Sequence, residues 1–251
     1  SVCVLLLVGC SAKSDKQADE YPVKLITVDP GHFHAALVQK SMYDEVSPVV
    51  NVYAPEGPEL NAYLKLIDKY HTREENPTTW EQTVYKGNDY FEKMLEQKAG
   101  NVVVLAGNNK KKTAYIKKSV DAGLNVLSDK PMAIDAQGFE VLLDAFAAAK
   151  KNNVLLYDIM TERYEITSIL QKELSQQKEL FGELEKGTLG NPAVTKESVH
   201  HFYKHVSGSP LIRPTWYYDV EQEGNGLVDV TTHLVDLIQW ECFPGVSLDY
   251  K

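Results

Sequence analysis

The stretch from residue 102 to residue 133 reads VVVLAGNNKKKTAYIKKSVDAGLNVLSDKPMA, and it decides the fold class. It opens with residues 102–106 (VVVLA), a continuous apolar run of the kind that is buried in a parallel sheet. A helical pattern follows at 113–122 and ends at Gly123, a residue type that often terminates helices. Residues 125–128 then form a second short strand. The order of strand, helix and strand predicts a parallel βαβ unit.

The same alternation extends on both sides of this stretch. It predicts a doubly wound parallel sheet, because each strand is separated from the next by a helical segment. The further strands are expected at 23–28, 49–53 and 154–157, and the further helices at 60–70, 88–97 and 137–150, with one more helix beginning at residue 35.

The pattern changes after about residue 160. A long polar helix is expected at 165–185, a strand-like stretch at 193–205, and a helix at 228–240 that follows a tryptophan-bearing loop. We therefore divide the chain into a leader and tether (1–20), a Rossmann domain (21–158) and the start of an α+β substrate domain with a mostly antiparallel sheet (159–251).

Composition and charge exclude some functions. The 251 residues are 43% hydrophobic and 24% charged, which is ordinary for a globular protein. The net charge of −9, from 35 acidic and 26 basic side chains, disfavours nucleic acid as a partner. The run at 110–112 (KKK) is interpreted as a solvated helix face. The cysteines, Cys3, Cys10 and Cys242, form neither a disulfide framework nor a zinc-type spacing.

The turn after the first strand is a candidate phosphate-binding turn. It reads Asp29-Pro-Gly-His-Phe-His-Ala, where the dinucleotide fingerprint has G-x-G-x-x-G. Only Gly31 is retained, at the position where backbone amides approach the pyrophosphate. Asp29 could repel phosphate, whereas His32 or His34 could donate to it. Glu56, beyond the second strand, is the nearest acid for the ribose and favours NAD over NADP.

Two segments of the opening stretch carry a family resemblance. Residues 106–109 (AGNN) and 128–131 (SDKP) are similar to the A-T-P-N and C-E-K-P motifs of the glucose–fructose oxidoreductase/inositol dehydrogenase (Gfo/Idh/MocA) family, with the same order and spacing. The resemblance implies that Ala106, Asn108, Asn109 and Asp129 line the cofactor. It also implies that Lys130 reaches both substrate and nicotinamide, where its cation can polarise a substrate oxygen.

A third segment completes the resemblance. Residues 224–237 (GNGLVDVTTHLVDL) resemble the family's G-G-G-x-x-x-D-x-x-x-H-x-x-D-x block, shortened by one residue. Asp229 and His233 are four residues apart, which stacks them on one helix face. By resemblance His233 is the acid/base for the substrate hydroxyl and Asp229 supports it. Trp216 and Arg163 are the candidate substrate-binding residues.

Three further histidines raise the question of a metal site. His200, His201 and His205 lie in the strand-like stretch, where their spacing distributes them along one face with no cysteine or acidic cluster nearby. We expect no metal site.

The N-terminus suggests a membrane anchor. Residues 1–10 (SVCVLLLVGC) are too short to span a bilayer and end in a sequence that looks like the lipobox of bacterial lipoproteins, with Cys10 as the lipidated residue. Polar residues 11–20 would form a tether. The alternative is a buried strand that ends in Gly-Cys. We expect an extracytoplasmic lipoprotein that is attached to the membrane through its lipid alone.

The resemblance implies an NAD(P)-dependent oxidoreductase that acts on a sugar or polyol, either as a monomer or as a homo-oligomer. Outside the cytoplasm such an enzyme would need cofactor held at about nanomolar affinity or better. Two alternatives remain open: a glycoside hydrolase that uses bound NAD for transient oxidation and elimination, and a non-catalytic carbohydrate- or partner-binding lipoprotein. Few strands remain before Lys251, so we expect the substrate domain to be incomplete at its C-terminus.

Overall fold

The computed structural model describes residues 21–198, 203–206 and 208–249. Its core is a six-stranded, all-parallel sheet in the order β3-β2-β1-β4-β5-β6, which confirms the doubly wound fold class. The strands are β1 (Leu25–Val28), β2 (Val49–Ala54), β3 (Glu81–Lys86), β4 (Val102–Leu105), β5 (Asn125–Ser128) and β6 (Leu156–Asp158).

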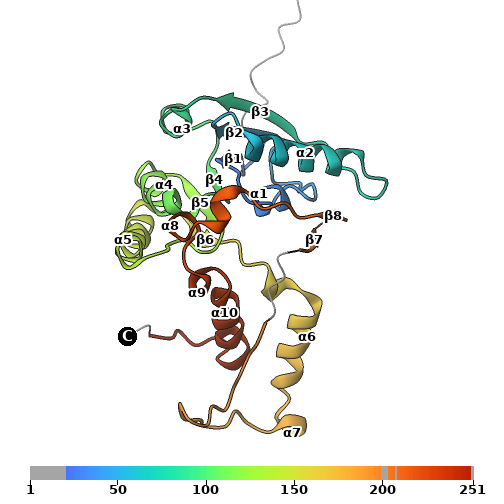
Figure 1. Ribbon diagram of the computed structural model, residues 1–251, viewed down its shortest axis with the longest axis vertical. Coiled ribbons are helices and arrows are strands. Elements are labelled where there is room, and N and C mark those ends of the chain that lie inside the picture. The colour runs from blue at the N-terminus through green and yellow to red at the C-terminus, as the bar shows by residue number, and fades with distance from the viewer. Residues whose placement is uncertain (1–20, 199–202, 207, 250–251) are drawn as a thin grey trace, which may run out of the picture.

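Each face of the sheet carries its own apolar core. Neighbouring strand residues point to opposite faces, so Val103 belongs to one cluster and Val104 to the other. The helices α1 (His34–Leu37) and α2 (Pro58–Thr72) cover the Val104 face. On the Val103 face lie α3 (Tyr90–Gln97), α4 (Asn109–Asp121) and α5 (Ala136–Asn152), as can be followed in Figure 1.

The edge strand β3 was not predicted. Its sequence, EQTVYK, is largely polar and is not recognisable as a strand by itself. It forms because all six of its residues pair in parallel with β2, from Val49↔Glu81 to Ala54↔Lys86. Backbone pairing supplied by a neighbour therefore overrides a weak local preference.

Helix α4 corrects the interpretation of the lysine run. It begins at residue 109 rather than 113, because the side chain of Asn108 accepts a hydrogen bond from the Lys110 amide and caps the helix. Lys110 and Lys111 are exposed, but Lys112 points inward and is only 2% exposed. The run is therefore not a uniformly solvated face.

Beyond the sheet the chain is less regular than expected. The predicted helix at 165–185 is two helices, α6 (Ile166–Ser175) and α7 (Lys178–Phe181), neither of which has a buried residue. Short helices without a buried face gain little from packing, so the longer helix does not persist. In the described part of the stretch at 193–205, only its last residue is in a strand, within the two-residue pair β7 (His205–Val206) and β8 (Ser209–Pro210).

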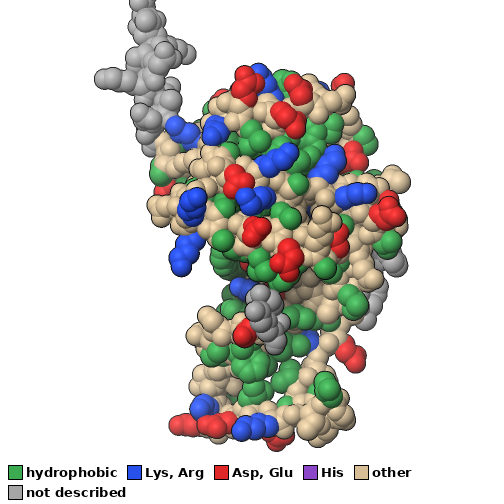
Figure 2. Space-filling model, turned by 90° about the vertical axis from the view of Figure 1, so that its left-hand side faces the viewer, with side chains coloured by type: hydrophobic (Ala, Val, Ile, Leu, Met, Phe, Trp, Pro, Cys, Tyr) green, Lys and Arg blue, Asp and Glu red, His purple; other side chains and the backbone are tan. Residues whose placement is uncertain are grey.

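The predicted helix at 228–240 is also interrupted. It consists of α9 (Gly226–Asp229) and α10 (Thr231–Cys242), which meet at Val230. Together with α6 and α7 they form a separate lower part of the molecule. Figure 2 shows apolar side chains gathered on this lower part, and the exposed ones include Ile166, Leu170, Leu174 and Val235.

One segment returns from the lower part to the sheet. Residues 213–223, here named the strap, include the 3-10 turn Thr215–Tyr218 and the short helix α8 (Val220–Glu223). Helix α8 packs beside α4, at the edge where the parallel strands end (Figure 1). Ligands of open α/β sheets bind at this edge, so the strap lies over the candidate site. No helix among the described residues is both long and apolar enough to cross a membrane.

Candidate functional site

The turn after β1 is bound tightly to the end of β4. Asp29 adopts a left-handed backbone with φ of 47°, the conformation that the first glycine of the usual fingerprint would take. The amide of Gly31 donates to the Asp29 carbonyl at 2.8 Å, and the amide of His32 donates to the Ala106 carbonyl at 2.9 Å. The Asp29 carboxylate accepts a hydrogen bond from the Tyr90 hydroxyl at 3.0 Å, and this bond fixes the side chain that stands where the fingerprint has its first glycine.

Two glycines of this region are closely packed. A Cβ on Gly107 would lie 2.0 Å from the Asp29 carbonyl oxygen, so the end of β4 can approach the turn only as glycine. A Cβ on Gly31 would lie 3.2 Å from Cζ2 of Trp216. Trp216, a candidate from the sequence, therefore covers the phosphate-type turn directly.

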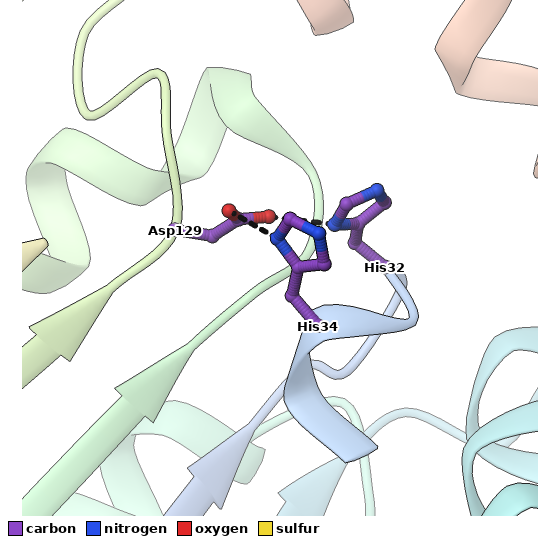
Figure 3. A group of neighbouring side chains, drawn as sticks. All are labelled: His32, His34 and Asp129. Atoms are coloured by element: carbon purple, nitrogen blue, oxygen red, sulfur yellow. Dashed lines mark hydrogen bonds and ion pairs between the residues drawn. The ribbon is translucent and has the colours of Figure 1, made fainter. Parts of the chain in front are cut away.

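Both histidines of the turn point at one carboxylate. Nδ1 of His32 lies 2.6 Å from Oδ2 of Asp129, and Nδ1 of His34 lies 2.8 Å from Oδ1 (Figure 3). Arg213 can only donate, and its Nη1 lies 3.1 Å from Nε2 of His32, so that nitrogen accepts and Nδ1 carries the proton. Each imidazole thus donates to Asp129 and is oriented by it.

Burial and these contacts set the charges of the group. Burial alone would raise the pKa of Asp129, which is 2% exposed, but the two imidazoles hold it well below its usual value. Burial lowers the pKa of His32 to about 4, against the attraction of Asp129. At neutral pH the group therefore contains an ionised carboxylate and a neutral His32.

The same three residues have ligand atoms close enough for a metal ion, within 4.8 Å of one another. Both Nδ1 atoms, however, meet carboxylate oxygens at hydrogen-bonding distance, and Arg213 takes the other nitrogen of His32. His32, His34 and Asp129 are therefore arranged as a hydrogen-bonded group rather than as metal ligands. Of the histidines considered from the sequence, His205 lies on β7, and His200 and His201 fall outside the described residues.

Lys130 and Asp229 form a buried ion pair. They are 9% and 7% exposed, and Nζ of Lys130 lies 2.5 Å from Oδ1 of Asp229 and 3.0 Å from its carbonyl oxygen. The Tyr217 hydroxyl donates to Oδ2 at 3.2 Å. Burial and the Asp229 charge raise the pKa of Tyr217 to about 12, so it remains a donor. The lysine and aspartate expected from the sequence are brought together across 99 residues of chain.

His233 is close to this pair but on the next helix. Its Nδ1 is buried without a hydrogen-bond partner, and the nearest carboxylate oxygen in the described residues is Oε1 of Glu162 at 3.6 Å. Burial and then the charge of Lys130 lower its pKa to about 4, which leaves the imidazole unprotonated at neutral pH. Asp229 acts on His233 through its charge, whereas its carboxylate oxygens bind Lys130 and Tyr217.

The start of α4 holds the strap. The side-chain amide of Asn108 donates to the side-chain oxygen of Gln222 at 2.9 Å, and the side-chain amide of Asn109 donates to both the carbonyl and the carboxyl group of Glu223 at 2.9 Å. Nζ of Lys112 donates to Oδ1 of Asn109 and to the carbonyls of Asp129 (3.2 Å) and Pro131 (3.3 Å). Both candidate asparagines therefore bind the strap, and buried Lys112 joins α4 to the Lys130 loop.

Glu223 makes this junction sensitive to pH. Burial, followed by the charge of Asp229, raises its pKa from 4.5 to about 8. The folded protein therefore holds the Glu223 proton more tightly than the unfolded chain does. This contribution to stability is fully present below the unfolded pKa of 4.5 and is lost as the pH rises through the folded pKa of about 8. Glu223→Gln keeps a neutral side chain of the same shape. We therefore expect the wild type to lose about 3 kcal/mol of stability relative to the variant between pH 5 and pH 8.

Urea denaturation midpoints at pH 5.0, 6.5 and 8.0 measure this difference. Glu221→Gln, at an exposed position on the same short helix, is the matched control and should show no such trend. A difference between wild type and Glu223→Gln that stays constant with pH would mean that Glu223 is ionised in the folded protein.

Two other candidates are placed away from the ion pair. The guanidinium of Arg163 pairs with both carboxylate oxygens of Asp236 on α10, one of them at 2.6 Å from Nε, so it links the segment before α6 to α10. Glu56 is exposed just past the end of β2, at the edge where a ribose would be expected.

Sequence reasoning missed several residues of the site: Arg213, Tyr217, Glu162, Lys112 and Glu223. Arg213 and Tyr217 flank the predicted Trp216 and could have been considered with it. Glu162 immediately precedes Arg163 in a segment that was singled out for its arginine. Lys112 and Glu223 gave no local signal, because only the packing of α8 on α4 buries them.

Comparison with known families agrees with this geometry. The model of the oxidoreductase family with an NAD-binding Rossmann fold, Gfo/Idh/MocA, matches residues 28–158. The chain belongs to this family. A model of an oxidoreductase C-terminal domain matches residues 170–251. The chain therefore has an NAD-binding Rossmann domain, and the expected family and cofactor class are confirmed.

Solved structures support the same assignment. A protein from Parabacteroides merdae ATCC 43184, described as an oxidoreductase, is 60% identical to this chain. The two superpose with a TM-score of 0.87, over 92% of this chain and 53% of the length of that protein. The WlbA dehydrogenase from Bordetella pertussis, in complex with NADH and UDP-GlcNAcA, is 18% identical, with a TM-score of 0.55 over 88% of this chain and 55% of its own.

Biliverdin reductase from Synechocystis sp. PCC 6803, in complex with biliverdin and NADP⁺, is 14% identical, with a TM-score of 0.58 over 90% of this chain and 60% of its own. At these low identities the last two proteins show the shared fold alone. The chain spans a little more than half the length of these structures. Among curated proteins, no significant match was found.

The residues at the strand ends fit a dinucleotide that carries phosphate. Gly31 leaves the turn without a side chain of its own at the position where backbone amides approach a pyrophosphate, and the Trp216 ring of the strap lies over this position. The unpartnered Nδ1 of buried His233 is a further polar atom that a ligand can satisfy. The residues that would hold NAD are therefore the turn at Gly31 and His32, Trp216 of the strap, and Lys130.

Proposed function

We propose that the protein is an NAD(P)-dependent oxidoreductase that moves a hydride to or from a hydroxyl-bearing carbon of a sugar or polyol. The observation that supports this most strongly is the buried Lys130–Asp229 pair beside an unprotonated His233, at the edge where Rossmann ligands bind. An unprotonated imidazole can accept a hydroxyl proton, and the Lys130 ammonium group next to it stabilises the negative charge that develops on the oxygen.

The nicotinamide, when bound, supplies the hydride chemistry, and the protein supplies orientation and electrostatics. Lys130 donates a hydrogen bond to the substrate oxygen and stabilises negative charge that develops there. Asp229 and the Tyr217 hydroxyl fix the position of the lysine. His233 takes the hydroxyl proton during oxidation and returns it during reduction.

Two measurements on the full-length protein test this proposal. Nucleotide released on denaturation is identified by mass, and the protein is assayed at 340 nm with a panel of sugars and polyols. Bound or titratable NAD(H) together with net oxidation supports the dehydrogenase. Bound NAD with release of sugar from glycosides and no net oxidation supports the hydrolase instead. A protein that binds sugar but none of the four nucleotide forms is a binding protein.

We also propose that the protein is a lipoprotein anchored through Cys10 on the outer side of a membrane. The support is the apolar run that ends in Leu7-Val8-Gly9-Cys10, followed by a polar tether; these residues lie outside the described part of the chain. Cys10→Ser is expected to move the protein from the membrane fraction to the soluble fraction and to remove labelling by a palmitate analogue. Cys3→Ser is the control, and a Cys10→Ser variant that stays labelled would contradict the anchor.

A further inference from the structure

The hairpin that leads into the strap brings two cations to the site. Lys204 immediately precedes β7, and its carbonyl accepts from the amide of Leu211 at 2.8 Å, which extends the β7–β8 pairing by one residue pair. Arg213 lies two residues beyond Leu211, on the side of the hairpin that Lys204 shares. Nζ of Lys69 on α2 donates to Oγ of Ser209 at 2.9 Å and ties the hairpin to the Rossmann domain.

Arg213 is held in place by neutral groups. Its guanidinium lies over the Tyr217 ring, 4.2 Å from the centroid, and reaches Nε2 of His32 at 3.1 Å. The Tyr217 hydroxyl in turn binds Asp229, so the guanidinium is separated from the catalytic ion pair by a single aromatic ring. No described carboxylate forms an ion pair with Arg213.

Lys204 is the second cation that lacks an acidic partner in the described residues. It is half-buried on the side of the hairpin that Arg213 shares, and burial, followed by the charges of Arg213 and Lys130, lowers its pKa. Asp229 and Glu162 act in the opposite direction. Asp229 pairs with Lys130, and Asp129 binds the two histidines of the turn. No acid among the described residues forms an ion pair with Lys204 or Arg213.

Two cations without ion pairs at one site stand out in a chain whose net charge is −9. We infer that Lys204 and Arg213 bind an anionic group, a carboxylate or phosphate, on the substrate next to its reacting carbon, so that the substrate is an acidic sugar rather than a neutral polyol. The inference rests on the proposed function for its reacting carbon, but the anion site itself rests on the hairpin. Charge-assisted hydrogen bonds to two cations would orient the substrate over Lys130 and His233.

Paired titrations of the NADH-loaded, full-length protein test the anion site. The probes are D-glucuronate and glucose 6-phosphate, compared with D-glucose. We expect at least one acid to bind roughly 10-fold or more tightly than glucose, and Lys204→Met to remove this preference, because a hydrogen bond between two charged groups is stronger than one to a neutral hydroxyl. Arg213→Met is a second variant with the same expectation, and Lys151→Met, on an exposed position of α5, is the matched control.

The outcomes separate this inference from the proposed function. Acid binding that depends on Lys204, without turnover of any sugar, would support the anion site while the dehydrogenase proposal fails. Equal binding of acids and glucose, binding of no probe, or a loss of preference in Lys151→Met as well would overturn the anion site. A Lys204→Met variant that loses NADH affinity alone would overturn it too, because the anion would then be the cofactor pyrophosphate.

Discussion

Replacing Lys130 with Met is expected to lower kcat by about 10²–10³ and to destabilise the fold by about 3–5 kcal/mol. The variant removes the cation that stabilises charge on the substrate oxygen, a contribution of about 10²–10³ in kcat for one such donor. It also leaves Asp229, which is 7% exposed, as a buried carboxylate whose cation is gone. Steady-state kinetics and urea denaturation measure the two effects separately.

The double variant Lys130→Met/Asp229→Asn separates catalysis from folding. It removes the buried charge, so stability should largely return while kcat stays low. Lys117→Met, which breaks an exposed pair with Asp121 on α4, is the matched control and should change neither quantity appreciably. A Lys130→Met protein that is fully stable, or one that turns over substrate at the wild-type rate, would contradict the role of this pair.

The second large effect is expected at Asp129. Asp129→Asn replaces one of two accepting oxygens with an amide donor, which then faces the N–H of a histidine that needs an acceptor. His32 cannot change its tautomer without losing its bond to Arg213. We expect a loss of about 3–4 kcal/mol in the free energy of unfolding, since two hydrogen bonds to a buried charge are disturbed.

Urea denaturation with Asp121→Asn as the exposed control measures this loss. A second readout is specific to the arrangement: the NMR titration of His32 should move from its wild-type pKa of about 4. If Asp129→Asn is as stable as the wild type and leaves the imidazole resonances unchanged, the two histidines are not oriented by this carboxylate.

Much of the Rossmann domain was readable from the sequence because its signals are local. Val102–Leu105 and the helix after it are buried on fixed faces, so their apolar spacing appears in the chain itself. Lys130 was identifiable from the resemblance of residues 128–131 to a family motif, and it lies two residues after β5, at the edge where Rossmann ligands bind. Asp229 and His233 were found through the order of the family block, although they lie on two short helices rather than one.

The sequence by itself thus determined the parallel sheet, the family and the three residues proposed for catalysis. Tertiary structure alone decided that β3 is a strand, that Lys112 is buried, and that Arg213 reaches His32 across 181 residues. It also decided that His32 and His34 turn toward Asp129. The physical reason is the range of the forces: periodicity records burial along one element, whereas the direction of a polar side chain depends on partners that only the folded chain brings near.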